Sequence, residues 1–249
     1  AGAPAVKVSK NAKAAKVLAS SARMTGKEGH DDAFVRFAAQ DPHTDKALAT
    51  MRRERVKVGM KRAWDTYHAH AWGKDTVLPL SKAAADRWGG MAMTMLDSLS
   101  TLWVMGLKDD FMQARDWIAE NLTFKNVGHI SVFETNIRAL AGLLSAYDLS
   151  QDKIFLDKAV ELGDLLLPAF DSKTGFPING LDLSTGQHSG SHSTCLAEFG
   201  TMQIEFRYLS HATGNPIYAE KAMHVFEKMH EESAKVANHG VFKLDYNAD

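Results

Sequence analysis

The spacing of apolar residues is helical over most of the chain. From about residue 44 onward they recur three and four positions apart, and the alternating segments that form strands are scarce. This pattern predicts an all-α protein. Helices are expected over residues 46–71, 92–105, 108–122, 132–147, 151–167, 194–212 and 215–230.

The residues between these segments are typical of helix ends. Gly106 closes the second predicted helix, and Pro168 ends the fifth. Residues 148–150 are expected to form a turn, with Ser150 as the N-cap of the next helix. The connection over residues 169–193 is long, which is typical of a functional loop. Short turns alternating with longer loops suggest stacked antiparallel hairpins, in a solenoid or a closed α/α toroid.

The first part of the chain differs in composition from the rest. Residues 1–27 carry six lysines and arginines and no acid, and they offer little apolar surface to offset the entropy of ordering. We expect residues 1–45 to be a flexible stalk or linker and residues 46–249 to form the folded domain. Because the sequence begins with Ala1 rather than Met, we also expect a signal or anchor segment to precede it.

Charge and cysteine content exclude several function classes. The 29 basic and 30 acidic side chains nearly cancel, which argues against nucleic acid or an anionic membrane surface as a partner. No run of 18 apolar residues is present. A single cysteine, Cys195, cannot form an internal disulfide, and no Cys/His spacing suggests zinc.

Two acids near the start of apolar helical segments are the strongest candidates for a site. Glu134 and Arg138 are four residues apart and therefore share a helix face. They form either a surface ion pair or an acid and a guanidinium that line a sugar pocket. Glu198 has apolar neighbours and is either a helix N-terminal acid favoured by the macrodipole or a site residue.

Other polar and aromatic residues are interpreted more conservatively. Asp97 lies inside an apolar helix and can serve there by bonding a neighbouring backbone group or arginine. Glu205, close to Arg207 and Tyr208, is interpreted as structural. Trp64 and Trp103 are expected in the core, whereas Trp88 follows Arg87 at a glycine-rich helix entry and could edge a cleft.

Eight short sequence words, in order along the chain, together resemble the class I α-mannosidases of glycoside hydrolase family 47. The resemblance runs from about Met51 to the end of the chain. The words are Ala63-Trp64, Ala71-Trp72-Gly73-Lys74-Asp75, Pro79-Leu80-Ser81, Asp97-Ser98-Leu99, Val104-Met105-Gly106-Leu107, Ser131-Val132-Phe133-Glu134-Thr135-Asn136-Ile137-Arg138, Leu166-Leu167-Pro168-Ala169-Phe170 and Leu196-Ala197-Glu198-Phe199.

This resemblance implies a fold, an activity and roles for particular residues. The fold would be an all-α (α/α)7 toroid, of which residues 46–249 are expected to be about the first half. The activity would be calcium-dependent, inverting removal of terminal α-1,2-linked mannose from high-mannose N-glycans. Glu134 would be the proton donor, and Arg138, Glu198 and Asp97 would bind substrate. The family usually has a second Asp where this chain has Ser100.

Several expectations concern what lies outside these residues. An inverting glycosidase needs a second carboxylate to activate water, and the family's words for that carboxylate and for its calcium-holding Thr are absent here. We therefore expect the calcium ligand downstream and the C-terminal half of the domain as a partner. A location in the endoplasmic reticulum or Golgi lumen, with a membrane anchor, is also implied. Asn121-Leu122-Thr123 would then be a usable glycosylation sequon. The alternative function is a mannose-binding, lectin-like quality-control protein of the same fold without efficient hydrolysis.

Overall fold

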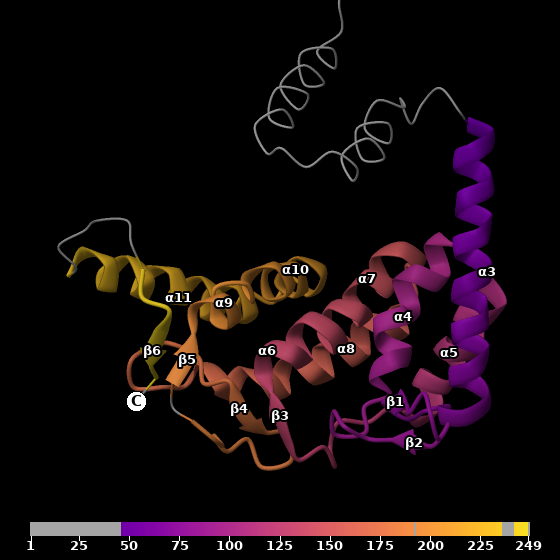
Figure 1. The fold of residues 1–249 in the computed structure, drawn as a ribbon. Coiled ribbons are helices and arrows are strands. Elements are labelled where there is room, and N and C mark those ends of the chain that lie inside the picture. The colour runs from indigo at the N-terminus through magenta and orange to yellow at the C-terminus, as the bar shows by residue number, and fades with distance from the viewer. Residues whose placement is uncertain (1–45, 192, 236–241, 249) are drawn as a thin grey trace, which may run out of the picture. The chain divides into compact units, whose positions relative to one another are not determined.

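The computed structural model describes residues 46–191, 193–235 and 242–248. The chain divides into two compact units, residues 1–60 and 61–249, and the helix α3 (Lys46–Ala71) begins in the first and ends in the second (Figure 1). The predicted stalk over residues 1–45 lies outside the described residues. Within the described ranges, no helix is both long enough and apolar enough to cross a membrane.

The second unit is built mainly from helices, which confirms the predicted all-α class. In Figure 1, α4 lies beside α7, and α10 lies beside α11, which are the pairs in closest contact. The longer helices after α3 are α4 (Met93–Val104), α5 (Lys108–Asn121), α7 (Ala141–Ser150), α8 (Lys153–Leu166), α10 (Gln203–Thr213) and α11 (Ile217–Ala234). The shorter ones are α6 (Val132–Thr135), the π-helical turn η1 (Asn136–Leu140), the 3₁₀ helix η2 (Leu167–Phe170) and α9 (Leu196–Phe199).

Apolar residues at helical spacing form the core of this unit. One stripe of α4 is fully buried and packs on α7 and α5, and it consists of Met93, Met95, Leu96, Leu99 and Leu102. Trp64 is buried as expected, whereas Trp103 is only partly covered and stacks edge-on against Phe111. Burial of such a stripe, rather than helix propensity, supplies most of the stability of helices of this length.

Three differences from the predicted helices change the local structure around the predicted site or the capping of a helix. The helix expected over residues 132–147 begins as α6, opens into the π turn η1 and continues as α7. The helix expected over residues 194–212 is broken between α9 and α10 at residues 200–202. Finally, α7 includes Ser150, and the next helix is capped by Asp152, whose side chain accepts a hydrogen bond from Ile154 N at 3.1 Å.

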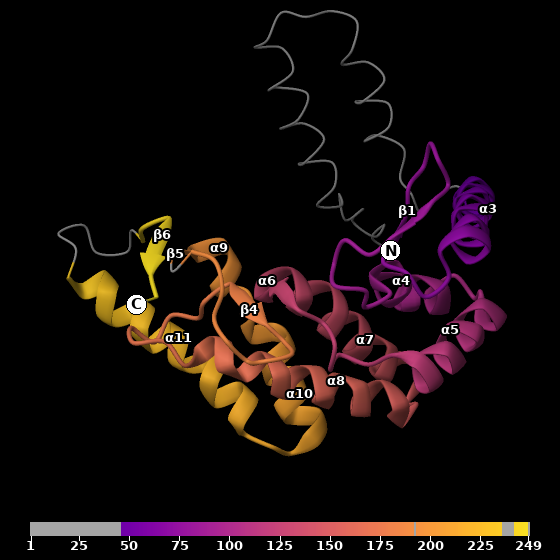
Figure 2. The ribbon, with the colours of Figure 1, turned by 90° about the horizontal axis from the view of Figure 1, so that it is seen from below.

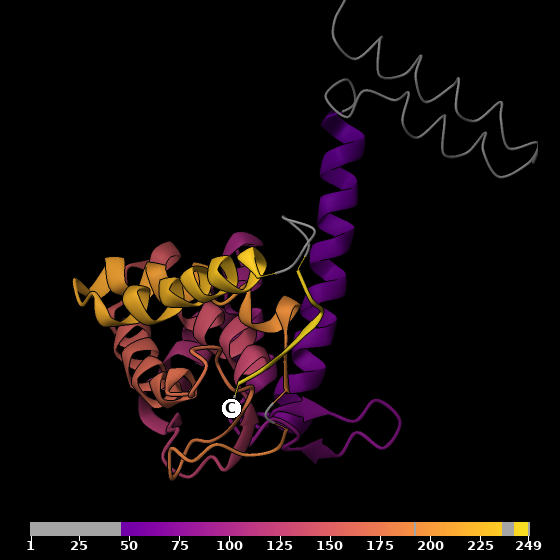
Figure 3. The same ribbon diagram turned by 90° about the vertical axis from the view of Figure 1, so that its left-hand side faces the viewer.

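Three antiparallel strand pairs that the periodicity did not indicate hold the loops together. They are β1 (Thr76–Val77) with β2 (Ala84–Ala85), β3 (His129–Ser131) with β4 (Gly180–Asp182), and β5 (Ser193–Cys195) with β6 (Asp245–Asn247). Figure 1 shows β3 leading into α6, and Figure 2 and Figure 3 show β6 alongside β5. Both β3 and β5 lead directly into a four-residue helix. Those two helices carry the two acids singled out from the sequence.

Candidate active site

Glu134 is placed by the junction between β3 and α6. Ser131 ends the strand and caps the helix, its Oγ accepting a hydrogen bond from Glu134 N at 3.2 Å. Asn179, in the long connection before β4, supports the same junction. Its Oδ1 accepts hydrogen bonds from Phe133 N (2.9 Å) and Ser131 Oγ (3.0 Å). Its backbone carbonyl accepts a third from Val132 N at 2.7 Å. The expectation of a functional connection over residues 169–193 is consistent with this contact.

Arg138 joins two of the predicted site acids. Its Nε donates to Glu134 Oε2 at 2.6 Å, and its Nη1 donates to Asp97 Oδ2 at 3.3 Å. The side chains of Arg138 and Asp97 are 37% and 38% exposed and that of Glu134 is 28% exposed, so a ligand from solvent can reach all three. Glu134 and Arg138 are thus more than a local helix pair, because α4 contributes a second carboxylate to the same guanidinium.

Trp88 adds an aromatic face to this group. Its ring centroid lies 5.1 Å from Arg138 Cζ, within the range of a cation–π interaction. The loop that carries Trp88 is held by the buried Asp75, whose carboxylate accepts hydrogen bonds from Trp88 N (2.7 Å), Gly90 N (2.9 Å) and Met93 N (3.1 Å). Beyond its place in a family word, Asp75 could not be singled out from the sequence, because its hydrogen-bond partners are backbone groups.

A close approach of two helices brings Asp97 to Arg138. The α-carbon of Gly142, on α7, faces the backbone of α4, and a Cβ added there would lie 2.5 Å from the carbonyl oxygen of Leu96. Since Leu96 precedes Asp97, this contact fixes the distance between the helix that carries Asp97 and the segment that carries Arg138. Gly142 therefore belongs to the framework of the site.

The surroundings of Asp97 favour its protonated form. Loss of hydration raises the pKa of Asp97 above its ordinary value, the hydrogen bond and charge of Arg138 oppose that shift, and the nearby Glu134 carboxylate adds to it. Two carboxylates share one guanidinium here. Their oxygens accept hydrogen bonds and the guanidinium donates them, so the group can bind hydroxyl groups.

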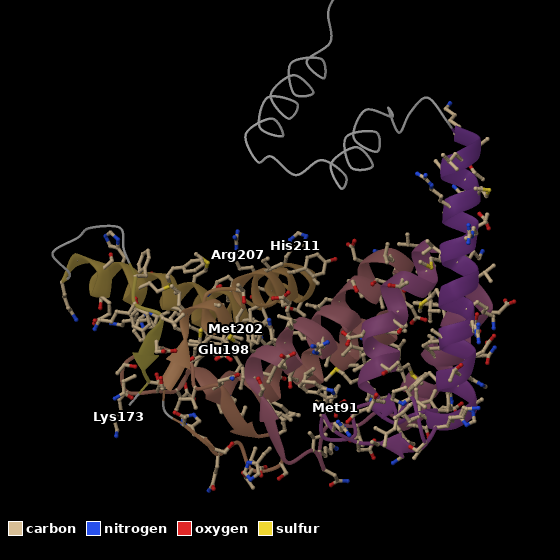
Figure 4. All side chains as sticks on the ribbon, in the orientation of Figure 1. Met91, Lys173, Glu198, Met202, Arg207 and His211 are labelled. Atoms are coloured by element: carbon tan, nitrogen blue, oxygen red, sulfur yellow. The ribbon has the colours of Figure 1, made fainter. Side chains whose placement is uncertain are left out.

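Glu198 lies apart from these three residues. It occupies the third position of α9, and its Oε2 accepts a hydrogen bond from Cys195 N at 3.4 Å, which closes a capping box. It lines a small cavity with Phe133 and Asn179. In the described part of the chain it makes no hydrogen bond or ion pair with Glu134, Arg138 or Asp97. Figure 4 shows it near Met202, where the chain passes from α9 to α10.

Glu205 has a partner that the sequence did not reveal. Its neighbour Arg207 is exposed and, in Figure 4, projects with His211 from the other side of α10 from Glu198 and Met202. Glu205 instead accepts a hydrogen bond from Nδ2 of the buried Asn136 at 2.9 Å. Asn136 lies between Glu134 and Arg138 in the sequence. Glu205 therefore contacts the backbone segment that carries these two residues through a buried side chain.

The described residues do not provide a metal centre. Within the described ranges, no three His, Cys, Asp or Glu side chains converge so that they could hold an ion. No step of the chemistry derived for the described residues involves a metal ion. The calcium ligand expected from the resemblance stays a prediction.

Comparison with known proteins identifies relatives of one kind. A mannosyl-oligosaccharide 1,2-alpha-mannosidase from Arabidopsis thaliana is 45% identical over 202 residues, covering 79% of this chain and 35% of the relative. An endoplasmic reticulum mannosyl-oligosaccharide 1,2-alpha-mannosidase from Rattus norvegicus is 39% identical over 202 residues, covering 80% and 31%. The structure of the alpha-1,2-mannosidase from Trichoderma reesei superposes with a TM-score of 0.69 at 30% identity, over 72% of this chain and 40% of that one.

These likenesses agree with the all-α toroid class that the eight sequence words implied, over the part that is matched. The chain spans about a third of the length of the curated relatives it matches. The model of the family named Glycosyl hydrolase family 47 matches residues 59–249, which include all four predicted site residues. Because this match covers well over half of the sequence, the chain belongs to glycosyl hydrolase family 47.

Proposed function

We propose that this chain carries the proton-donating side of an α-1,2-mannosidase site, which removes terminal α-1,2-linked mannose from high-mannose N-glycans. The observation that carries the proposal is the guanidinium of Arg138, hydrogen-bonded to both Glu134 and Asp97 and lying against the ring of Trp88. The names of the two relatives described above, both mannosyl-oligosaccharide 1,2-alpha-mannosidases, support the substrate class.

Glu134 is the proton donor in this proposal. As the bond between the anomeric carbon and the glycosidic oxygen breaks, Glu134 gives its proton to that oxygen, and the remaining glycan leaves as a neutral alcohol. Water attacks the anomeric carbon from the opposite face, with inversion, and loses its proton to a second carboxylate. We do not assign that second carboxylate to a residue of this chain. Arg138 and Asp97 bind and orient sugar hydroxyls, since a guanidinium and a carboxylate supply donors and acceptors on one surface.

Glu198 is proposed as a second substrate-binding acid. Its place at the third position of α9 repeats that of Glu134 in α6, and each follows directly from a strand. The small cavity that Glu198 lines also includes Phe133, the residue before Glu134. A sugar extending from Glu134 toward α9 would come within reach of it.

The setting proposed for this activity is N-glycan processing in the lumen of the secretory pathway, with calcium required and a membrane anchor present. The support is that the relatives include a protein named for the endoplasmic reticulum. Sugar substrates agree with the near-zero net charge, −1 at pH 7, because an uncharged ligand needs no electrostatic steering.

The test is release of free mannose from a high-mannose glycan with terminal α-1,2-linked residues. Two forms are compared, this chain and one that extends over the whole catalytic domain of the family, each with calcium and with a chelator. Glu134→Gln removes the proton donor at nearly constant shape, and Glu120→Gln, an exposed acid on α5, is the control. We expect calcium-dependent release by the extended form, lost in Glu134→Gln and kept in Glu120→Gln.

The same assay separates the proposal from its alternative. If neither form releases mannose although the glycan binds, the enzyme proposal is wrong and a mannose-binding, lectin-like protein remains. If Glu134→Gln releases mannose as fast as the unsubstituted form, the role of Glu134 is wrong while the activity stands.

A further inference from the structure

The π-helical turn η1 follows the helix that carries Glu134 and itself carries Arg138. It covers Asn136–Leu140, begins directly after α6 and includes Arg138. A π turn holds more residues than an α-helical turn and is intrinsically rare, and its occurrences concentrate at functional sites. A rare turn of this kind needs a stabilising contact from the rest of the protein. Because Arg138 lies in the widened turn, the backbone of the turn sets the position from which its side chain reaches Glu134, four residues earlier.

Asn136 is the first residue of this turn and faces inward. It is 0% exposed, and its Nδ2 donates to Glu205 Oε2, on α10, at 2.9 Å. Its Oδ1 is buried with no hydrogen-bond partner. A buried amide oxygen without a donor loses its hydrogen bonds to water and gains none in return, so this arrangement calls for an explanation.

A protonated Glu205 supplies the missing donor. A neutral carboxyl group has one O–H donor beside its acceptor oxygen, which matches the donor and acceptor of a side-chain amide. Consistent with this, burial raises the pKa of Glu205, while the hydrogen bonds from Asn136 and from its own backbone N–H oppose that shift. In the described residues no charged side chain contributes to the shift.

We propose that Asn136 and Glu205 are positioning residues of the site, joined as an amide–carboxylic acid pair in which Glu205 keeps its proton and donates it to Asn136 Oδ1. The pair ties the start of the π turn to α10 and thereby holds Arg138 against Glu134. Neither residue touches the reacting atoms. The role assigned to the pair rests on the proposed function, but the pairing itself does not.

Two substitutions at Glu205 test the pairing on this chain without any activity assay. Glu205→Gln keeps one donor and one acceptor toward Asn136, whereas Glu205→Ala removes both. The control is Glu120→Ala, an exposed acid on α5. The measurement is amide hydrogen exchange in the peptide that contains residues 136–140. We expect about tenfold faster exchange in Glu205→Ala, since a net hydrogen bond is worth up to about 1.5 kcal/mol, and native rates in the other two variants.

The proton is tested by the pH dependence of unfolding. A raised pKa means that the folded chain holds the proton more tightly than the unfolded chain does. This contribution to stability is present below the ordinary value of 4.5 and is lost as pH rises through the raised value. Glutamine is neutral at every pH, so the stability of Glu205→Gln relative to the native chain should rise as the pH is raised above 4.5.

The outcomes separate the pairing from the function. Native exchange rates in Glu205→Ala, or Glu205→Gln exchanging as fast as Glu205→Ala, would overturn the pairing. If Glu205→Ala does not fold, the comparison of Glu205→Gln with the native chain decides alone, and a stability difference that stays constant with pH would overturn the shared proton. In the extended form, we expect Glu205→Ala to lower kcat about tenfold with KM little changed, and Glu205→Gln to restore it.

Discussion

Replacing Gly142 with alanine tests whether the close approach of α4 and α7 builds the site. Alanine is the better helix former by about 1 kcal/mol, so propensity alone predicts a more stable protein. The surroundings predict the reverse. A Cβ at this position would lie 2.5 Å from the carbonyl oxygen of Leu96 and 3.0 Å from its carbonyl carbon.

The size of the effect follows from that contact. Ordinary contact begins at 3.4 Å, so the added methyl group is 3.4 − 2.5 = 0.9 Å too close. The obstacle is backbone, which no change of side-chain rotamer can move, so the two helices must separate. Overpacking of this kind costs about 1–3 kcal/mol, and the backbone clash places it near the upper value. After the gain in propensity of about 1 kcal/mol, the net loss is about 2 kcal/mol.

The assays are urea unfolding and thermal unfolding of this chain, each followed by circular dichroism. A loss of about 2 kcal/mol corresponds to a Tm about 4–8 °C lower in a protein of this size. The control is Gly59→Ala, a glycine inside α3 with no described atom within 4 Å of the added Cβ, which should cause no loss. If Gly142→Ala is as stable as the native chain, the reasoning is refuted. Separation of the helices also lengthens the Asp97–Arg138 contact of 3.3 Å, so activity of the extended form should fall with it.

Three further predictions concern single side chains. Asn179→Ala leaves Phe133 N without its acceptor and should cost about 1–3 kcal/mol in urea unfolding, whereas Asn179→Asp keeps an acceptor and should cost less; equal losses would contradict this. Arg138→Lys removes the fork that joins two carboxylates, so kcat/KM of the extended form should fall at least about tenfold while stability changes by less than about 1 kcal/mol; unchanged kcat/KM would refute it. Asn121 is exposed at the end of α5, so expression through a secretory host should add a glycan that a glycosidase and Asn121→Gln both remove; an unshifted mass would contradict it.

The sequence alone located the helices well where periodicity is strong. The helix predicted over residues 46–71 has those bounds in α3, and α4 and α5 begin and end within one residue of their predictions. The pairing of Glu134 with Arg138 was also foreseeable as one of two alternatives, because residues four apart on a helix face each other. These features depend on local spacing, which the sequence contains directly.

Where local patterns compete with long-range contacts, the sequence was insufficient. The helix predicted over residues 194–212 is broken after α9, a four-residue helix whose N-terminus is closed by a capping box of Cys195 and Glu198. Ser150, expected to cap the next helix, lies within α7 instead, and Asp152 is the N-cap of α8. The strand pairs join segments as far apart as Ser193 and Asn247. The strands are only two or three residues long, too short for an alternating pattern to predict them.

Only the tertiary structure decided how the site is assembled. Asp97 reaches Arg138 because Gly142 lets two helices approach, and Asn136 meets Glu205 across 69 positions of the sequence. Asp75 accepts hydrogen bonds from backbone N–H groups, which every residue type except proline has, so the sequence does not single out these partners. Spacing along the chain determined which side chains share a helix face, whereas packing between helices determined which faces meet.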